Sequence, residues 1–398
     1  MTKAFDGIRV IDTTHVLAGP FASYQMAVLG AEVIKVEAPH DPDQARWQGS
    51  DRALSDIGMG TAFMAQASNK KTLAVDLKTE MGRDALKRLI ATADVFVENY
   101  RPGAFDELGL GYDAMSKLNP GLIYCSISAF GATGPRAHLT GYDNILQAFS
   151  GMMAMTGHRD DPRPLKTGAP VVDYATGTTA AFAITSALLQ RERSAGKGQF
   201  VDVSMLEVAL ILTSSHLTGF KWNGKHPEPK GNTFPFATIG CYEASDAPMM
   251  IAASNLAQQE RLWTALGRPD MVKTDNNQRL DAHAEEEAAL AEIIATNTAD
   301  YWEKFLQQRR IPAARIRRLE EALADDQVAA RGVLHTHAAP DSVADGLTVP
   351  VLPFHMSDSP SQVTLPPQPV GAQTAEILAE LGYDAHEIAA MRSAGCIN

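Results

Sequence analysis

The sequence predicts an α/β protein with a Rossmann-like open parallel sheet in a large domain, followed by a smaller α+β domain. Strand-like and helix-like segments alternate regularly over the first third of the chain, as in doubly wound sheets. Two stretches rich in proline then interrupt the pattern, which is typical of linkers. The length of 398 residues is sufficient for two or three domains, at about 150 residues each.

The first segment reads as strand, helix, strand. Residues 8–11 (IRVI) are apolar and β-branched, and the helix expected over 20–29 opens with a proline in its first turn. After Gly30, residues 32–36 (EVIKV) return to strand character. This order predicts a βαβ unit, which requires two parallel strands and a right-handed crossover.

The alternation continues along the large domain. Helices are expected at 79–92 and 104–110, and strands at 94–98 and 122–126. A long helix rich in small residues follows over 175–189, and then come a strand at 200–203 and a helix at 205–212. The pattern predicts one continuous open sheet with helices on both faces.

Changes in amino-acid composition along the chain predict the domain boundaries. We expect the first part of a large cofactor-binding domain over 1–217, a linker over 218–235 and a small domain over 236–330. A hairpin at 241–252 and helices at 256–266, 284–295 and 300–308 make up the small domain. A second linker over 331–369 is expected to precede residues 370–398, whose two short helices, at 374–381 and 385–391, return to the large domain.

Composition and charge exclude several classes of protein. Hydrophobic residues make up 45% and charged residues 21%, and the net charge is 35 − 47 = −12. Such an acidic chain is a poor candidate for binding nucleic acid or an anionic membrane, and any anionic ligand needs local basic residues. No apolar run approaches the roughly 18 residues that span a bilayer, and the N-terminus lacks a leader pattern. We therefore expect a soluble cytoplasmic protein.

Several familiar active-site motifs are missing. The turn after the first strand, DTTHVLAGP, has no GxGxxG fingerprint, which argues against an NAD-dependent dehydrogenase. A P-loop and a GxSxG elbow are also absent. The three cysteines are far apart and the histidines form no HxxxH or HExxH pair, so we expect neither a disulfide framework nor a metal site.

Asp173 is the most conspicuous candidate for chemistry. It follows the apolar run APVV and directly precedes the long helix, so it is expected at a helix N-terminus. One interpretation is an N-cap, whose carboxylate accepts the unpaired backbone N–H groups of the first turn. The other is a nucleophilic carboxylate that the helix dipole keeps ionised.

Residues 141–143 (GYD) form a second group. Asp143 precedes a helix expected over 145–149 and is interpreted either as its cap or as part of a site. Tyr142 is a core, interface or site residue on the same grounds. Four basic residues also lie near the expected C-terminal strand ends, where open sheets bind ligands: Lys70, Lys71, Arg101 and Arg136. Together they are candidates to neutralise ligand phosphates.

These motifs resemble, in their order and spacing, the class III CoA-transferases, the family of formyl-CoA transferase and carnitine CoA-transferase. The resemblance covers the whole first domain. It rests on GIRVIDTTHVLAGP at 7–20, GAEVIKVE at 30–37, SNKK at 68–71, VENYRPG at 97–103, GYD at 141–143, Asp173 with its helix, and GKGQ at 196–199. It implies coenzyme A as acyl-CoA substrate, a small carboxylic acid as second substrate, and a homodimer of two interlocked chains.

The resemblance also implies site residues. Asp173 matches the catalytic aspartate, which attacks the thioester, and stores CoA as an aspartyl thioester; backbone N–H groups near Asp173 are expected to stabilise the oxyanions. Tyr142, Asp143 and His15 are expected to support it. Contacts to CoA are implied for His15, Val16, Ala18, Lys70, Lys71, Asn99, Tyr100, Arg101 and Arg136.

The same family contains 2-methylacyl-CoA racemases, which exchange an α-proton with a His–Asp pair. Their histidine falls at Tyr142, and a phenol with a pKa of about 10 is a poor proton shuttle beside imidazole at about 6.5. The tyrosine therefore favours transfer over racemisation. A CoA-binding protein without catalysis is the remaining alternative, and the intact motif around Asp173 argues against it.

Two departures from the family pattern bear on the substrates. Leu17 replaces a glutamine of formyl-CoA transferase, and Ala38 replaces an arginine that relatives place against the adenosine phosphates. The acid is interpreted as a dicarboxylate such as succinate or mesaconate. Arg46, His15 and Arg163 are the candidates to bind its second carboxylate.

Overall fold

A computed structural model describes residues 3–161 and 163–398, and these residues divide into two compact units. Unit 1 comprises Met1–Met152, Lys166–Lys225 and Arg331–Asn398, and unit 2 comprises Met153–Leu165 and His226–Ala330. The first two residues of the expected 1–217 domain lie outside the described part. Within the described residues, no helix is both long and apolar enough to cross a membrane.

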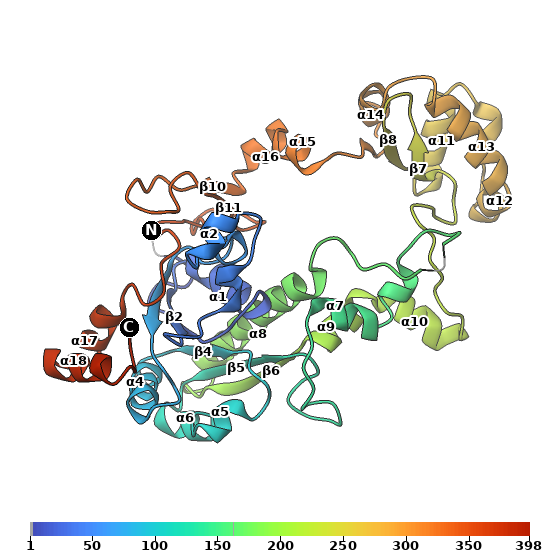
Figure 1. The fold of residues 1–398 in the computed structure, drawn as a ribbon. Coiled ribbons are helices and arrows are strands. Elements are labelled where there is room, and N and C mark those ends of the chain that lie inside the picture. Colours follow the sequence, from blue (N-terminus) through green and yellow to red (C-terminus); the bar gives the residue numbers. More distant parts are fainter. Residues whose placement is uncertain (1–2, 162) are drawn as a thin grey trace. The chain divides into compact units, whose positions relative to one another are not determined.

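Unit 1 is built on a six-stranded sheet in which all strand pairs are parallel (Figure 1). The strand order is β3-β2-β1-β4-β5-β6. The strands are β1 (Arg9–Asp12), β2 (Glu32–Glu37), β3 (Lys70–Ala74), β4 (Val95–Glu98), β5 (Ile123–Ser128) and β6 (Gln199–Ser204). The order reverses between β1 and β4, which makes this the switch point of a doubly wound sheet. The predicted fold class is confirmed.

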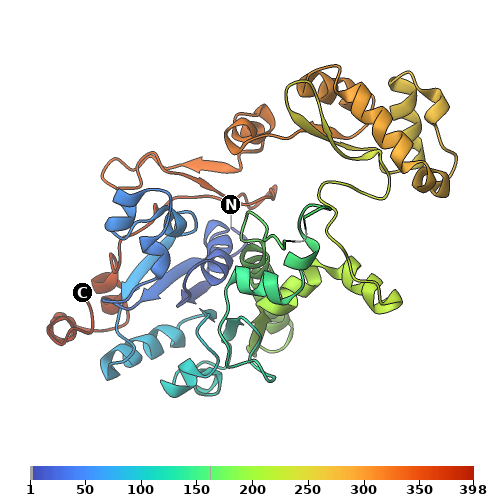
Figure 2. The same ribbon diagram turned by 45° about the vertical axis from the view of Figure 1, so that its right-hand side comes forward.

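Two hydrophobic cores cover the two faces of this sheet, because alternate strand residues point to opposite faces. Val10 of β1 belongs to one core and Ile11 to the other. The core of Val10 is closed by α1 (Ala18–Val28), α7 (Asp143–Phe149), α8 (Val171–Arg193) and α9 (Met205–Leu212). The core of Ile11 is closed by α4 (Glu80–Ala91), α5 (Ala104–Glu107), α6 (Tyr112–Leu118), α17 (Thr374–Glu380) and α18 (Ala385–Ser393), and Figure 2 shows this second group from another side.

The sequence pattern misses several elements of unit 1. Strand β3 begins at the basic pair Lys70-Lys71, whose charge conceals its strand character. Helix α10 (Ser214–Asn223) extends into the stretch expected as a linker over 218–235. In the stretch 331–369, β10 (Leu334–Thr336) and β11 (Thr348–Pro350) form an antiparallel hairpin. Short helices α2 (Arg52–Asp56) and α3 (Thr61–Met64) follow β2.

Unit 2 combines a small antiparallel sheet with helices. Strands β7 (Ile239–Glu243) and β8 (Pro248–Ala252) form the predicted hairpin, and β9 (Ala313–Arg315) pairs with β8. The helices are α11 (Leu256–Ala265), α12 (Asn276–Asp281), α13 (His283–Ile294), α14 (Ala299–Gln307), α15 (Leu319–Leu323) and α16 (Asp326–Arg331), the last ending where unit 1 resumes. Its own core surrounds Trp263, which is fully buried.

A buried ion pair joins β3 to the end of β1. The Lys70 ammonium contacts an Asp12 carboxylate oxygen at 3.0 Å and donates to the Pro20 carbonyl and the Ser23 hydroxyl. Lys70 is 1% exposed. An ammonium with three protein acceptors and no surface has no room for a ligand phosphate, so the expected role of Lys70 in CoA binding is corrected here to a structural one.

We predict that Lys70→Ala lowers the free energy of unfolding by about 3–5 kcal/mol, because it leaves the Asp12 carboxylate buried without this partner. Lys71→Ala is the matched control. The half-buried Lys71 pairs with Glu376 at the surface, and its loss costs about 0–1 kcal/mol. Urea unfolding monitored by circular dichroism measures both. Equal effects of the two substitutions contradict the structural role of Lys70.

Candidate active site

A cavity of about 520 Å³ lies in unit 1 at the switch point of the sheet. Its walls come from the loops that follow β1, β2, β3, β4 and β5, and from the first turn of α8. Seven of the predicted site residues line it: His15, Val16, Ala18, Asn99, Tyr100, Tyr142 and Asp173. The strand-end rule for open sheets therefore places the site in the region that the motifs indicate.

Asp173 is the third residue of α8 and lies in its first turn, with Pro170 at the N-cap position. The interpretation of Asp173 as the N-cap is therefore wrong. Its side chain is partly buried and lines the cavity. Burial and the nearby Asp143 carboxylate raise the pKa of Asp173 to about 7. Burial therefore acts against the ionisation of this carboxylate that was expected from the helix dipole.

Asp143 supplies the cap that Asp173 does not. It is the first residue of α7 and is buried, and one of its carboxylate oxygens accepts from the backbone N–H of Val172 at 2.8 Å and of Asp173 at 3.2 Å. Its other oxygen accepts from the Gln147 side-chain amide at 2.6 Å. Asp143 therefore caps α8, not its own helix, and holds the backbone of Asp173 in place.

This arrangement corrects a second expectation. The N–H groups of Val171 and Tyr174 bond to the carbonyls of Ala169 and Pro170. With Val172 and Asp173 bonded to Asp143, all four amides in the first turn of α8 already have acceptors. The backbone N–H groups next to Asp173 are therefore not free to stabilise an oxyanion.

The loops after β1 and β4 are tied together at the cavity wall. Asn99 accepts from the His15 N–H at 2.8 Å and donates to the His15 carbonyl at 2.9 Å. The His15 ring contacts the Tyr100 hydroxyl through Nε2 at 2.5 Å, and the two rings meet edge to face. Burial and the nearby Lys35 ammonium lower the pKa of His15, so its ring is neutral at pH 7.

The other basic residues that were predicted to bind phosphate are not among the residues that line this cavity. Lys71 pairs with Glu32 and Glu376, and Arg101 pairs with Glu107 through two hydrogen bonds. The Arg136 guanidinium stacks over the Phe149 ring, with 4.7 Å between the guanidinium carbon and the ring centroid. Roles of Lys71, Arg101 and Arg136 in binding phosphate stay predictions.

Sequence reasoning missed two basic residues that do line the cavity, Lys78 after β3 and His40 after β2. Both are exposed at its edge, together with the acidic Asp41. The signal for Lys78 was the position of β3: once Lys70–Ala74 is recognised as a strand, the residues that follow it lie at the ligand edge of the sheet.

The three residues predicted to bind a second carboxylate of the substrate differ in their position relative to the cavity. Arg46 is 0% exposed and forms a two-pronged pair with Glu37, with distances of 2.8 and 2.6 Å, so the prediction that it reaches a substrate is wrong. Arg163 belongs to unit 2 and pairs with Asp161. Of the three candidates, His15 lines the cavity.

The fold and the cavity define a doubly wound α/β protein with a partly buried carboxylate, Asp173, that lines a cavity at its switch point. The model of one family, described as CoA-transferase family III, matches residues 5–374. The chain therefore belongs to CoA-transferase family III, which confirms the resemblance of its motifs, and it is an enzyme of this class.

Relatives and solved structures agree with this assignment. The succinate–glutarate CoA-transferase of Agrobacterium fabrum is 35% identical over 386 residues, which cover 94% of this chain and 95% of the relative. The acetyl-CoA:oxalate CoA-transferase of Acetobacter aceti is 35% identical over 335 residues, with 83% and 85% covered. A crystal structure of a CaiB/BaiF family protein from Brucella suis matches with a TM-score of 0.82 and 32% identity, covering 96% of this chain and all of that one.

The raised pKa of Asp173 predicts a dependence of stability on pH. The unfolded chain releases this proton near the ordinary aspartate pKa of 3.8, while in the folded protein the pKa of Asp173 is about 7. The folded state therefore binds more protons across this window, and the wild type loses stability as pH rises through it. We expect Asp173→Asn to unfold at higher temperature than the wild type at pH 8, with a smaller difference at pH 5.

Thermal unfolding at the two pH values measures this difference. Asp113→Asn, in the first turn of α6 on an exposed surface, is the matched control and leaves the pH dependence unchanged. A difference between Asp173→Asn and the wild type that is the same at pH 5 and pH 8 contradicts the raised pKa.

Proposed function

We propose that this enzyme transfers CoA from an acyl-CoA thioester to a small dicarboxylic acid, with Asp173 as the nucleophile. One observation carries the proposal: a partly buried carboxylate in the first turn of α8 lines the same cavity as the loops after β1 and β4. The relatives described above are named for succinate, glutarate and oxalate, which supports a dicarboxylate as acceptor.

The reaction proceeds by covalent exchange at the Asp173 carboxylate. A carboxylate oxygen attacks the thioester carbonyl carbon, the C–S bond breaks, and a mixed anhydride and CoA thiolate result. The thiolate attacks the Asp173 carbonyl carbon of the anhydride and displaces the first acid as its carboxylate. The acceptor carboxylate then attacks this aspartyl thioester and releases thiolate, which attacks the acceptor's acyl carbon and frees Asp173.

The raised pKa of Asp173 favours its role as a nucleophile. A carboxylate of a weaker acid is a better nucleophile, and a pKa of about 7 leaves about half of the groups ionised at neutral pH. Asp143 maintains this state, because its charge disfavours ionisation of Asp173 while its hydrogen bonds fix the helix backbone. Tyr142, at the N-cap position of α7, is 56% exposed and contributes its phenol to the cavity wall.

The residues that line the cavity support the proposal that it binds CoA. The loop residues His15, Val16, Asn99 and Tyr100, with Ala18 at the start of α1, are proposed to contact the CoA thioester arm. Lys78 and His40 at the edge are proposed to receive its phosphates. Lys71, Arg101 and Arg136 stay candidates to add positive charge. His15 is proposed to donate a hydrogen bond to the second carboxylate of the acid, because its ring is neutral and retains one N–H.

We also propose that the enzyme is a homodimer, interlocked as the family resemblance implies. The consecutive helices α9 and α10 leave large apolar side chains exposed: Ile211 at 72%, Leu212 at 49%, Leu217 at 40% and Trp222 at 90%. Contiguous exposed apolar residues of this size are typical of interfaces between chains. This surface favours association of two copies.

Replacement of Asp173 by Asn is expected to lower the rate of CoA transfer by at least about a thousandfold, because an amide does not attack the thioester to form the anhydride and the aspartyl thioester. The assay follows conversion of succinyl-CoA and free glutarate to glutaryl-CoA by mass spectrometry. Activity of Asp173→Asn within tenfold of the wild type contradicts the proposal. The reaction is also run in deuterated water, where deuterium incorporated at the α-carbon would indicate racemase chemistry.

The transfer rate is expected to rise with pH through a midpoint of about 7, because only ionised Asp173 attacks the thioester. Asp143→Asn removes the neighbouring charge and keeps an acceptor for the N–H groups of α8, so the midpoint is expected to move to lower pH. The rate measured at saturating succinyl-CoA from pH 5 to 9 tests this. An unchanged midpoint in Asp143→Asn contradicts the coupling of the two carboxylates.

A further inference from the structure

The turn His15-Val16 at the cavity wall has an unusual backbone. Val16 adopts a φ of 70°, in the left-handed region that β-branched residues rarely occupy. Such a conformation persists only where the surroundings hold it, and it is concentrated at functional sites. Both residues line the cavity, so the shape of this wall depends on whatever holds the turn.

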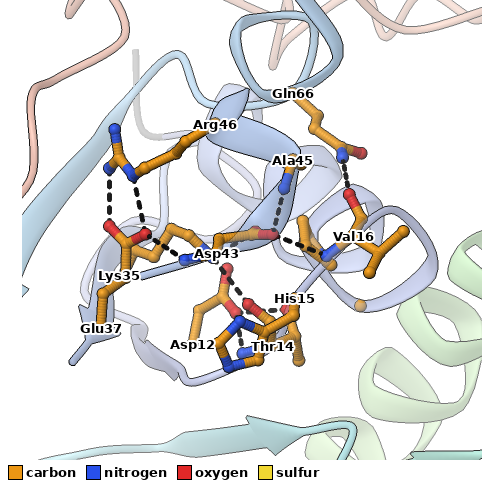
Figure 3. A network of polar contacts seen from close by, with 12 residues as sticks. Asp12, Thr14, His15, Val16, Lys35, Glu37, Asp43, Ala45, Arg46 and Gln66 are labelled. Carbon is orange, nitrogen blue, oxygen red and sulfur yellow. Dashed lines mark hydrogen bonds and ion pairs between the residues drawn. The ribbon is translucent and has the colours of Figure 1, made fainter. Parts of the chain in front are cut away.

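Asp43 is the residue that holds the Val16 amide (Figure 3). One carboxylate oxygen accepts from the Val16 N–H at 2.9 Å and from the Ala45 N–H at 3.0 Å. The other oxygen forms an ion pair with the Lys35 ammonium at 3.1 Å. Asp43 and Lys35 are each 1% exposed, so neither is available to contact a ligand directly.

Two further side chains complete the clamp on this turn. Lys35 also donates to the Thr14 carbonyl at 2.7 Å, and Gln66 donates to the Val16 carbonyl at 2.8 Å. With Asn99 bonded to the His15 backbone, the polar backbone groups of His15 and Val16 are all bound by side chains. Among these side chains, Asp43 is the one that bonds to the strained residue Val16 and also forms a buried ion pair, with Lys35.

A second buried pair holds Asp43 itself. Glu37, at the end of β2, accepts from the Asp43 N–H at 3.2 Å and binds the Arg46 guanidinium in two-pronged fashion. Arg46 in turn stacks over the Phe63 ring at 3.7 Å from its centroid. These contacts hold the segment between β2 and the 3-10 turn at Gln44–Trp47, and this segment positions the Asp43 carboxylate next to the Val16 N–H.

We propose that Asp43 is a positioning residue for coenzyme A, which holds Val16 in the left-handed conformation and thereby fixes the cavity wall formed by residues 15–17. This inference rests on the proposed function, because it concerns the same cavity. Asp43 contacts the backbone of the wall and not the ligand, so its loss changes affinity through Val16.

A double-mutant cycle on CoA binding tests this role. Asp43→Ala removes the acceptor for the Val16 and Ala45 N–H groups and the ion pair with Lys35. The dissociation constant for CoA, measured by calorimetry, is expected to increase about tenfold, or about 1.4 kcal/mol. Val16→Gly adopts positive φ without strain. In the Val16→Gly background, Asp43→Ala is therefore expected to weaken binding by less than about threefold.

Two controls separate positioning from general stability. Asp51→Ala removes another capping aspartate of the same segment, which bonds to the Leu54 N–H outside the cavity, and it leaves CoA affinity unchanged. Asp43→Asn keeps the acceptor for the Val16 N–H and places an amide against Lys35, so it is expected to bind CoA within about threefold of the wild type. If Asp43→Ala does not fold, this variant tests the inference, because a tenfold loss of affinity in Asp43→Asn contradicts a role through the Val16 contact. Circular dichroism verifies the fold of each variant.

The outcomes distinguish this inference from the proposed function. A wild type that does not bind CoA overturns the proposed function. If the wild type binds CoA and Asp43→Ala binds equally well, Asp43 is not a positioning residue. The inference is also overturned if Asp43→Ala weakens CoA binding equally in the wild type and in the Val16→Gly variant, because Asp43 then acts independently of the strained turn.

Discussion

The site exists because the chain leaves the sheet in opposite directions at two adjacent strands. After β1 the chain continues into α1, on the face of the Val10 core, and after β4 it continues into α5, on the opposite face. The two loops therefore diverge and leave a cavity at the strand ends. His15 comes from one loop and Tyr100 from the other, and the first turn of α8 adds Asp173 to the same wall.

Six buried charged side chains of this acidic protein form ion pairs next to the site. Asp12 with Lys70, Lys35 with Asp43 and Glu37 with Arg46 are internal pairs around the end of β1 and β2. Their desolvation is costly, and their value is geometric, since each fixes a backbone segment next to the cavity. Asp173 differs from all of them: no ion pair to it occurs among the described residues, and burial together with the nearby Asp143 carboxylate raises its pKa.

Much of the fold could be predicted from the sequence because the spacing of apolar residues and the residues that begin and end helices can be recognised within short stretches of the chain. The predicted boundaries agree with the observed ones to within one or two residues for three elements: the strands expected at 8–11 and 32–36, which are β1 and β2, and the helix expected before Gly30, which is α1. Strand β3 was missed because Lys70 and Lys71 interrupt its apolar character. Burial of Lys70 depends on Asp12, a partner 58 residues away that no local pattern reveals.

The candidate site was predictable in its residues but not in its electrostatics. The family resemblance implies His15 and Asn99, and Tyr142 and Asp173 also stand out because each lies near the start of an expected helix. The role of Asp143 as the cap of α8 depends on a contact between α7 and α8 across 29 residues of sequence. The same holds for Arg46, whose pairing with Glu37 removes it from solvent.

The most direct measurement of the central claim is mass spectrometry of the peptide that contains Asp173, after incubation of the enzyme with succinyl-CoA and quenching with hydroxylamine. Hydroxylamine attacks an aspartyl thioester at its carbonyl carbon and releases CoA. The account predicts a hydroxamate on Asp173, absent when succinyl-CoA is omitted and absent in Asp173→Asn. An enzyme that transfers CoA at full rate while Asp173 stays unmodified throughout turnover would contradict it.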